Sequence, residues 1–170
     1  MKELLKYFLR GLESIESLPF RKFVSSINES DSLMNGHTLM TEDFQRIYSW
    51  NEISRIHRVR HGIYQRNGEL ISLLTDFGKI NPCYPDIHGE TTDTIFYTGA
   101  GRRGDQQLDS FNQAMFNAIE SKHAVPLFNK LAVGRWEFMG FWRVTEGVYV
   151  YDEAQTRMIW KFTLERSSGK

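Results

Sequence analysis

The sequence predicts an α+β fold built on a curved, mostly antiparallel β-sheet or barrel. About five to seven strand-like apolar runs follow one another through short polar connections, and one helical pattern interrupts them. The runs lack the regular strand–helix alternation of a doubly wound parallel sheet, which argues against that class. Aromatic residues make up 14% of the chain, a share that favours strands and stacking surfaces.

Composition limits the classes of protein to which the chain can belong. With 170 residues, 41% of them hydrophobic, it is long enough for one domain with a sizeable core and an appendage. The net charge is zero, which argues against binding nucleic acid through bulk charge but allows a local basic face. Cys83 is the single cysteine, so we expect neither a disulfide framework nor a cysteine metal site.

The sequence shows no segment for membrane insertion or export. No apolar run approaches the roughly 20 residues of a membrane span. The N-terminus carries acidic residues from Glu3 onward and lacks a small-residue cleavage site, unlike a signal peptide. We therefore expect a cytoplasmic protein without membrane contact.

The N-terminal part predicts helices that precede the main domain. Residues 1–17 place apolar side chains on one helical face, and Pro19 starts a second helical piece with a similar pattern. A polar loop follows, so we divide the chain into a helical extension with a loop at 1–40 and a domain at 41–170. An alternative function is a protein-interaction module in which the face at 1–27 pairs with a partner.

The elements of the domain are predicted in order. Residues 44–57 predict a strand and a short helix, capped by Ser49 or Asn51. Residues 69–77 form an almost unbroken apolar run, typical of a central strand. Residues 93–101 predict a strand that ends at glycines. The C-terminal part predicts a strand at 125–131, a hairpin at 136–152 with its turn near Glu146–Gly147, and a closing strand at 156–166.

The glycine turn predicts an anion site. Glycines end the strand at Gly99 and recur on both sides of Arg102 and Arg103. Asp105 is the predicted N-cap of a helix that runs to about His123. Glycines let the backbone approach a ligand closely, while two cations and a helix N-terminus favour an anion.

The most basic window lies at residues 55–66, with four arginines, two histidines and no acid. A charge run is often a solvated face, but this one lies beside a glycine and contains interleaved polar and aromatic residues. It predicts contacts with nucleic-acid phosphates through Arg58, Arg60, His61 and Arg66. Tyr64 and Gln65 are candidates for a base or groove contact.

Two strand ends carry residues suited to a pocket. Tyr84 and Pro85 lie in a proline-bounded loop, and Tyr97 lies at the end of the strand before the glycine turn. If these segments are adjacent, they line an aromatic pocket beside Arg102 and Arg103. The alternative is that Tyr97 is a core residue and Pro85 forms a turn.

The sequence offers little for catalysis. It contains neither the phosphate-loop pattern, nor GxGxxG, nor a serine nucleophile elbow. His57 and His61 are the one histidine pair at metal spacing, and the expected acid is missing nearby. We expect no cofactor, no metal and no catalytic residue. A metal-dependent nuclease that acts through Asp86 and neighbouring acids is kept as an alternative.

A string of short motifs runs through about residues 44–165. It comprises Trp50-Asn-Glu-Ile, His57-Arg58, Gly62-Ile63, Tyr84-x-Asp86 with Gly89, Tyr97-Thr-Gly-Ala-Gly101, Gly104-Asp-Gln106 and Asn112-x-Ala114. This string resembles the SRA (YDG) superfamily of modified-DNA readers. It is most similar to the SRA-like sulfur-binding domains, which recognise phosphorothioate DNA, of McrA-type HNH restriction endonucleases.

The resemblance implies a PUA-like β-barrel with flanking helices that reads a DNA modification and does no chemistry. In the family's methylcytosine readers, a flipped base enters a pocket between two tyrosines, with an acid at the base edge. On this basis we assign the modification pocket to Tyr84, Pro85, Asp86, Tyr97, Thr98 and Gly99.

The glycine turn departs from the base-flipping readers, which carry a long finger after it. Here Gly101–Gly104 leads directly into a predicted helix, so weight shifts to the sulfur readers, which flip no base. A phosphorothioate sulfur is large, poorly hydrated and polarisable, and an apolar cup at Tyr84–Pro85 with a cationic rim suits it. The rim is formed by Arg58, Arg60, Arg66, Arg102 and Arg103.

We therefore predict a non-enzymatic domain that recognises phosphorothioate DNA, the recognition module of a modification-dependent (type IV) restriction system. Its expected partners are modified double-stranded DNA and a fused or associated nuclease domain, while its oligomeric state is left open. The main alternative is a reader of 5-methylcytosine or 5-hydroxymethylcytosine that flips the base.

Overall fold

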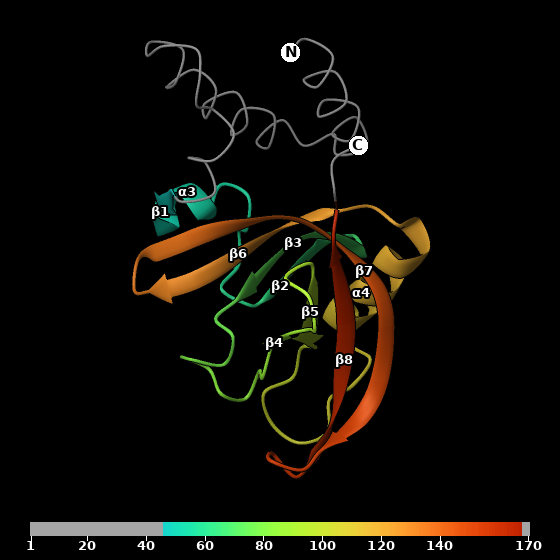
Figure 1. Cartoon of the computed structure of the whole chain (residues 1–170). Coiled ribbons are helices and arrows are strands. Elements are labelled where there is room, and N and C mark those ends of the chain that lie inside the picture. Colours follow the sequence, from blue (N-terminus) through green and yellow to red (C-terminus); the bar gives the residue numbers. More distant parts are fainter. Residues whose placement is uncertain (1–45, 168–170) are drawn as a thin grey trace, which may run out of the picture.

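The computed structural model describes residues 46–167, and the helical extension predicted at 1–40 lies outside this range (Figure 1). The described elements are β1 (Ile47–Tyr48), α3 (Trp50–Ile53), β2 (Ile63–Arg66), β3 (Glu69–Thr75), β4 (Ile87–His88), β5 (Thr94–Thr98), α4 (Ser110–Ser121), β6 (Val125–Ala132), β7 (Arg135–Asp152) and β8 (Arg157–Arg166).

The strands form one eight-stranded sheet in the order β2-β3-β6-β7-β8-β5-β4, with β1 paired to β7. Among the described strands, β3 and β6 are parallel and every other pair is antiparallel. The prediction of a mostly antiparallel sheet is therefore confirmed. The apolar strand β3 lies between β2 and β6, as its unbroken hydrophobic run predicted.

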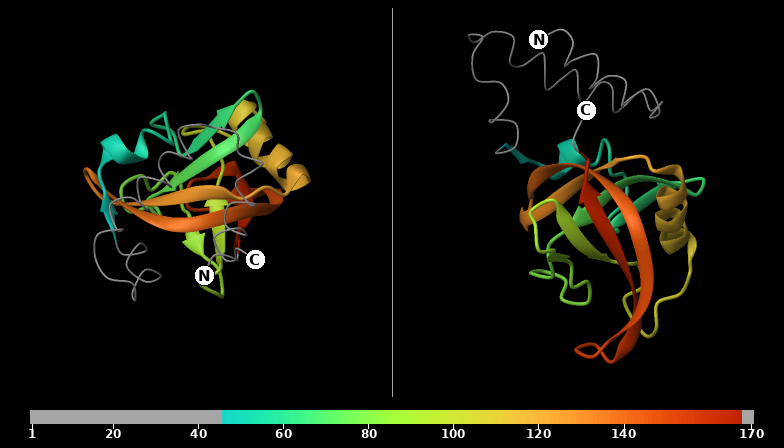
Figure 2. Two further views of the ribbon diagram at one scale, coloured as in Figure 1. Left: turned by 90° about the horizontal axis from the view of Figure 1, so that it is seen from above. Right: turned by 45° about the vertical axis from the view of Figure 1, so that its right-hand side comes forward.

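The sheet is strongly curved but does not close into the predicted barrel, because β2 and β4 stay at its edges (Figures 1 and 2). Side chains join the two halves instead. The Tyr97 hydroxyl on β5 donates a hydrogen bond of 2.9 Å to the Leu74 carbonyl oxygen on β3. The curvature therefore brings β3 and β5 together although they share no ladder.

Helix α4 covers the sheet at β2, β3 and β7. Its inward face carries Ala114, Met115 and Ala118, all fully buried. They pack into a core with Leu73, Trp142 and Phe162, among others. A second core cluster, around Tyr48 and Phe128, packs β1 and α3 against the β6–β7 hairpin.

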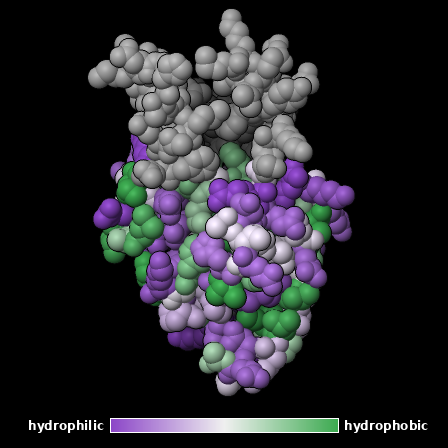
Figure 3. Space-filling view, in the orientation of Figure 1, coloured by the Kyte–Doolittle hydropathy of each residue, from purple (hydrophilic) through white to green (hydrophobic). Residues whose placement is uncertain are grey.

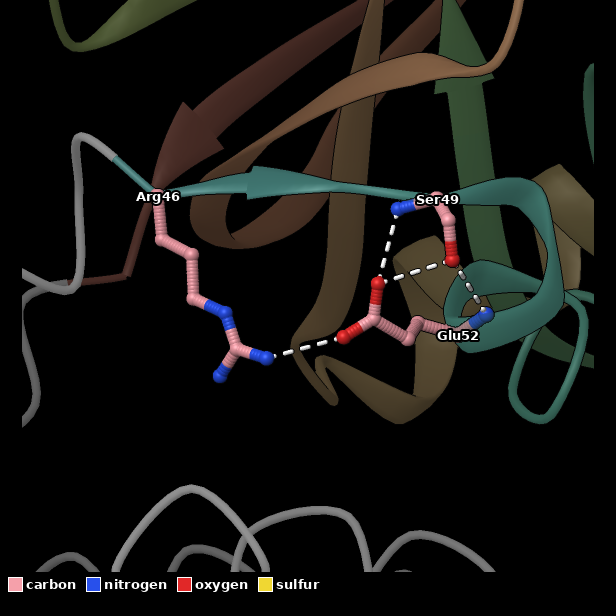
Figure 4. Close-up of polar contacts among 3 residues, drawn as sticks. All are labelled: Arg46, Ser49 and Glu52. Carbon is pink, nitrogen blue, oxygen red and sulfur yellow. Dashed lines mark hydrogen bonds and ion pairs between the residues drawn. The ribbon is translucent and has the colours of Figure 1, made fainter. Parts of the chain in front are cut away.

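Ser49 is the N-cap of the short helix α3, one of the two residues predicted to fill that role. Its side chain accepts a hydrogen bond from the Glu52 backbone nitrogen, and the Glu52 carboxylate accepts one from the Ser49 nitrogen in return. Figure 4 shows this capping box, with Arg46 donating to the other oxygen of Glu52 at 2.8 Å. The box ends β1 and turns the chain toward the basic window.

The predicted hairpin at 136–152 is wrong, because β7 is one continuous strand. Residues Glu146 and Gly147, the expected turn, pair with Thr163 and Phe162 of β8. A bulge between Val144 and Glu146 interrupts the register there and bends the strand. The sequence signal was real but marked a bend, since a glycine in a strand often marks a bulge or a close approach.

The described surface is mixed in character. Figure 3 shows hydrophobic residues gathered at the β6–β7 hairpin and along the lower part of the β7–β8 arm. The exposed large hydrophobic residues there include Val133, Val148 and Val150. Within residues 46–167, no helix is long and apolar enough to cross a membrane.

Replacing Gly147 by alanine is expected to destabilise the fold. A Cβ atom at this position would lie 2.8 Å from ring carbons of both the partly buried Phe116 and the buried Phe162, so these rings must move. Overpacking of this kind costs about 1–3 kcal/mol. Chemical denaturation of Gly147→Ala measures the loss. The exposed neighbour provides the control, since Glu146→Ala should change stability by less than about 0.5 kcal/mol. Equal stability of both variants would contradict the packing described here.

Candidate functional site

Two connections meet at one end of the sheet and carry most of the predicted pocket residues. The connection from β3 to β4 contains Tyr84, Pro85 and Asp86, and the connection from β5 to α4 contains the glycine turn. In Figure 1 both lie at the lower end of the molecule with the tip of the β7–β8 hairpin. The predicted adjacency of the two segments is thus present in the fold.

The glycine turn is shaped by two buried amide side chains. The Asn112 side chain on α4 accepts from the Ala100 nitrogen at 2.7 Å and donates to the Ala100 carbonyl oxygen at 3.0 Å. A Cβ atom at Gly99 would lie 2.6 Å from the Asn112 oxygen and 2.8 Å from Trp160 Cβ. Gly99 is therefore required by close packing, and the glycine–asparagine part of the motif builds the turn.

Gln106 fastens the segment after the turn to β8. Its side chain donates to the Gly99 carbonyl oxygen at 2.7 Å and accepts from the Trp160 nitrogen at 2.8 Å. Its backbone nitrogen donates to the Met158 carbonyl oxygen at 2.9 Å. Gln106 is 2% exposed, so the chain is fixed to β8 two residues after Gly104.

The helix start predicted at Asp105 is wrong. Helix α4 begins at Ser110, and Asp109 is its N-cap, accepting from the nitrogens of Phe111 and Asn112. The Asp105 carboxylate accepts instead from the Met158 nitrogen at 2.8 Å. An aspartate carboxylate can accept a hydrogen bond from a backbone nitrogen at a helix start or from one on a neighbouring strand. For Asp105 the neighbouring strand β8 supplies that nitrogen. The free part of the glycine turn is thus the stretch around Arg102 and Arg103, both exposed.

Asp86 holds the Tyr84–Pro85 turn to both halves of the sheet. One oxygen accepts from the Thr75 hydroxyl at 2.7 Å, and the other accepts from the Thr98 nitrogen at 2.6 Å. The residue is 4% exposed. Burial raises the pKa of Asp86 to about 7, because desolvation outweighs these hydrogen bonds and the charge of Lys161.

Two cations, the partly buried Lys161 and the buried Arg157, bind the backbone of the same turn. Lys161 on β8 donates to the Pro85 carbonyl oxygen at 2.9 Å and to the Thr98 hydroxyl at 3.1 Å. Arg157, also on β8, donates to the Cys83 carbonyl oxygen at 2.8 Å. Sequence reasoning missed both residues. The pattern offers no signal for them, since each is one cation among the alternating residues of a strand.

Tyr97 differs from the expected stacking wall. It is 3% exposed and belongs to the core, with its hydroxyl bonded to β3, as the alternative interpretation held. Thr98 and Gly99 are buried behind the turn as well. Along a strand, alternate side chains face the core, and this alternation buries Ile95 and Tyr97 together. Tyr84 and Pro85 therefore form the accessible surface of the pocket, both partly exposed.

Tyr84 lies against the glycine turn. Desolvation raises the pKa of the Tyr84 hydroxyl, whereas the charges of Arg157 and Arg102 and the backbone of Gly101 act in the opposite direction. These neighbours place the aromatic ring beside the arginine-bearing loop. An apolar surface next to two exposed guanidinium groups can bind an anion that has a poorly hydrated part.

The basic window lies in the connection before β2 and in β2 itself. Arg58, Arg60, His61 and Arg66 are exposed there. Arg60 stacks over the Trp50 ring at 4.8 Å, and the His61 ring lies 5.5 Å from that of Phe111. The Gly62 carbonyl oxygen accepts from the Leu74 nitrogen, which joins this loop to the end of β3. The window therefore lies beside the end of β3, from which the connection to Tyr84 and Pro85 starts.

The two predicted groove contacts are only partly available. Tyr64 is partly buried, with its ring 5.8 Å from that of His57. The Gln65 side-chain oxygen accepts from the Gly68 nitrogen at 2.9 Å and closes the β2–β3 turn. Gln65 therefore has a structural role in this conformation.

His57 is a buried anchor of the basic window. Its Nε2 and the His61 carbonyl oxygen are 2.6 Å apart, so Nε2 carries the proton and donates. Nδ1 then accepts from the Ser72 hydroxyl at 2.9 Å. Burial lowers the pKa of His57 from 6.5 to about 4, so the ring is neutral at physiological pH. Within residues 46–167, no three His, Cys, Asp or Glu side chains gather to hold a metal.

Comparison with known proteins identifies relatives of this fold. The model of the ScoMcrA-like SRA domain family matches residues 51–167. The SRA domain of SUVH5 in complex with hemimethylated CG DNA is similar, with a TM-score of 0.64 and 25% identity over 81% of this chain and 96% of that chain. The same domain bound to fully hydroxymethylated CG DNA gives a TM-score of 0.61 at 25% identity, with the same coverage of 81% and 96%.

A modification-dependent restriction endonuclease, TagI, shares the fold. Its TM-score is 0.62 at 17% identity, and the match covers 78% of this chain and 52% of that chain. None of the curated proteins matches this chain significantly.

The neutral His57 predicts a pH-dependent loss of stability. An unfolded histidine takes up a proton below about pH 6.5, whereas the folded protein resists until about pH 4, so stability falls as the pH drops through this window. In His57→Gln this contribution is absent. The difference in unfolding free energy between wild type and His57→Gln should therefore shrink by on the order of 3 kcal/mol between pH 7.5 and 4.

Urea denaturation across this pH range measures the difference. Asp86 contributes with the opposite sign, because its raised pKa makes protonation below about pH 7 favour the folded state. That contribution is common to both proteins and cancels. His88→Gln, at an exposed position, is the matched control and should leave the pH profile unchanged. A constant difference between wild type and His57→Gln would contradict the neutral, buried ring.

Proposed function

Because the chain belongs to the ScoMcrA-like SRA domain family, we propose that it is a non-catalytic domain that binds modified double-stranded DNA. The SUVH5 domain, which is similar over most of both chains, was solved with methylated and hydroxymethylated DNA, and TagI is a modification-dependent restriction endonuclease. The exposed arginines at the pocket and along the basic window support binding to the DNA backbone.

We further propose that the modification is a backbone phosphorothioate. The engagement of Asp86 carries this proposal. Its two carboxylate oxygens accept hydrogen bonds from Thr75 and Thr98, and the residue is 4% exposed, so the carboxylate faces into the sheet and not toward the side from which a flipped base would enter. What the turn presents outward is the partly apolar surface of Tyr84 and Pro85.

The chemistry of this surface suits sulfur. Replacing one backbone oxygen by sulfur creates a larger, weakly hydrated atom that gains from contact with apolar groups. Tyr84 and Pro85 supply that contact, while Arg102 and Arg103 pair with the negative charge and the remaining oxygen. Discrimination against ordinary phosphate arises because its oxygen would lose hydration on the same apolar surface.

The short free loop supports the same reading. Gln106 and Asp105 hold the segment after Gly104 on β8, which leaves Arg102 and Arg103 on a brief stretch. A finger that fills the space of a flipped base needs a longer free loop than this. A backbone reader needs none, because the modified atom already lies on the outside of the duplex.

A reader of 5-methylcytosine or 5-hydroxymethylcytosine is the second candidate, supported by the SUVH5 complexes. It requires the buried side chains of Asp86 and Tyr97 to become accessible to the base. The nuclease alternative through Asp86 has no metal-binding cluster to support it within the described residues. We assign cleavage to a fused or associated nuclease domain, as part of a type IV restriction system.

One duplex in several forms tests the proposal. Gel shifts compare the plain duplex with versions that carry phosphorothioate at defined steps, 5-methylcytosine or 5-hydroxymethylcytosine. We expect the phosphorothioate duplex to bind at least about tenfold more tightly than the plain one, a difference of about 1.4 kcal/mol. Equal weak binding of all forms would refute both reader hypotheses.

Asp86→Asn separates the two readers. Its side-chain oxygen still accepts from the Thr98 nitrogen, so the turn keeps its anchor and a backbone reader keeps its sulfur preference. A base reader that uses the carboxylate loses its preference for the modified base. Thermal unfolding of the variant shows that the comparison is made on folded protein.

Arg102→Ala and Arg103→Ala should each weaken binding to every duplex and flatten its salt dependence. If each arginine neutralises one phosphate, the slope of log K against log salt falls by about 1 per variant. Arg135→Ala, at the exposed start of β7, is the matched control for loss of a positive charge. Unchanged slopes for both loop variants would remove the role in phosphate binding assigned to them.

A further inference from the structure

Arg157 is a buried guanidinium at the start of β8, 6% exposed, in contact with both loops of the proposed pocket. We infer that Arg157 is the positioning residue of the proposed pocket. Its hydrogen bonds tie the Cys83–Pro85 turn to the Gly101–Gly104 loop. It also places behind these two segments a positive charge that forms no ion pair with any described carboxylate. This inference rests on the proposed function, and it identifies the residue that holds the two loops of the proposed pocket in a fixed relative position.

The hydrogen bonds of Arg157 reach three separate segments. Nη2 donates to the Cys83 carbonyl oxygen at 2.8 Å, beside Tyr84. Nη1 donates to the carbonyl oxygens of Gly101 at 2.8 Å and Gly104 at 3.2 Å, on either side of Arg102 and Arg103. A guanidinium presents its donors in one rigid plane, so these bonds fix the distance between the apolar surface and the arginine loop.

The Nε donor holds Arg157 itself in place. Nε donates to the Gln155 side-chain oxygen at 3.0 Å in the β7–β8 turn. Asp152, which faces Arg157 across the hairpin, accepts instead from the Gln155 nitrogen at 2.9 Å. The turn therefore orients the guanidinium through a neutral amide and uses the nearby acid for its own backbone.

Arg157 belongs to no ion pair among residues 46–167, and Asp152 opposite it on β7 bonds the Gln155 backbone instead. The ion pairs found within residues 46–167 join Arg46 to Glu52 and Arg166 to Asp93, and neither includes Arg157. Carbonyl oxygens satisfy its donors but do not cancel a full charge. A buried cation without a counterion is costly, and an anion bound at the neighbouring pocket would offset that cost. The effect of Arg157 on the Tyr84 hydroxyl shows that its field reaches this surface.

A lysine cannot replace this arrangement. Its single ammonium group keeps the charge but cannot span carbonyl oxygens in two loops with the geometry of a planar fork. The arginine therefore has two separable effects, one on the relative position of the loops and one on the electrostatic potential. Comparing Arg157→Lys with Arg157→Gln separates them.

Amide hydrogen exchange without DNA tests the positioning. In Arg157→Gln and Arg157→Lys, amides in segments 83–86 and 101–106 should exchange faster than in wild type, while those of α4 stay protected. Arg143→Gln, an exposed arginine on β7, is the matched control and should leave both segments unchanged. Unchanged exchange in the two Arg157 variants would overturn the positioning role.

Binding of the plain and phosphorothioate duplexes across salt concentrations tests the charge. Arg157→Gln removes the charge and should flatten the salt slope for both duplexes, which carry the same backbone charge. Because it also frees the two loops, it should lower the preference for phosphorothioate about tenfold or more. Arg157→Lys should keep the wild-type salt slope and lose preference only. If Arg157→Gln does not fold, as judged by its melting curve, Arg157→Lys alone decides, and an unchanged preference in it overturns the inference.

The two failures can be told apart. If wild-type protein binds all duplexes equally, the proposed function fails and the binding role of Arg157 fails with it. If wild-type protein prefers the phosphorothioate duplex and folded Arg157→Gln prefers it equally, the inference fails alone.

Discussion

One buried carboxylate joins the two halves of the curved sheet at the end that carries the Tyr84–Pro85 turn and the glycine turn. Asp86 accepts from Thr75 at the end of β3 and from Thr98 at the end of β5, two strands that share no ladder. The Tyr84–Pro85 turn takes its position from these bonds, so the accessible surface of the site depends on a group that is itself hidden from solvent. Because the residue is only 4% exposed, desolvation raises the Asp86 pKa to about 7.

Buried and exposed cations have different tasks around this carboxylate. Lys161 and Arg157 bind backbone carbonyl oxygens of the pocket loops and set their position. Arg102 and Arg103 stay exposed on a loop that those bonds hold in place. In the proposed site, the exposed arginines bind the anion, and Lys161 and Arg157 set the geometry of the loops. In the proposed site, such a division would let the two loops stay rigid, because hydrogen bonds fix them from behind while the arginines remain hydrated until DNA binds.

Most strands could be predicted because their hydrophobic patterns are local. The central strand β3 and the closing strand β8 lie where apolar periodicity indicated, and Ser49 caps α3 as its side chain predicts. The wrong predictions concern residues whose type suits two different structural roles. Gly147 marks a bulge within a long strand, and Asp105 caps a strand edge while Asp109 caps the helix. The turn-forming glycine and the capping aspartate were correctly recognised as such, but pairing with β8 determined which structure each of them forms.

The sequence by itself determined the family, the mostly antiparallel sheet and the residues of the two pocket loops, since these are written in motifs of a few consecutive positions. Only the tertiary structure decided which of those residues are accessible. It buries Tyr97 in the core, occupies both oxygens of Asp86, and brings Arg157 from a distant strand to the back of the pocket. The reason is physical: exposure and hydrogen-bond partners depend on how a curved sheet brings distant strands together, and no local pattern records that curvature.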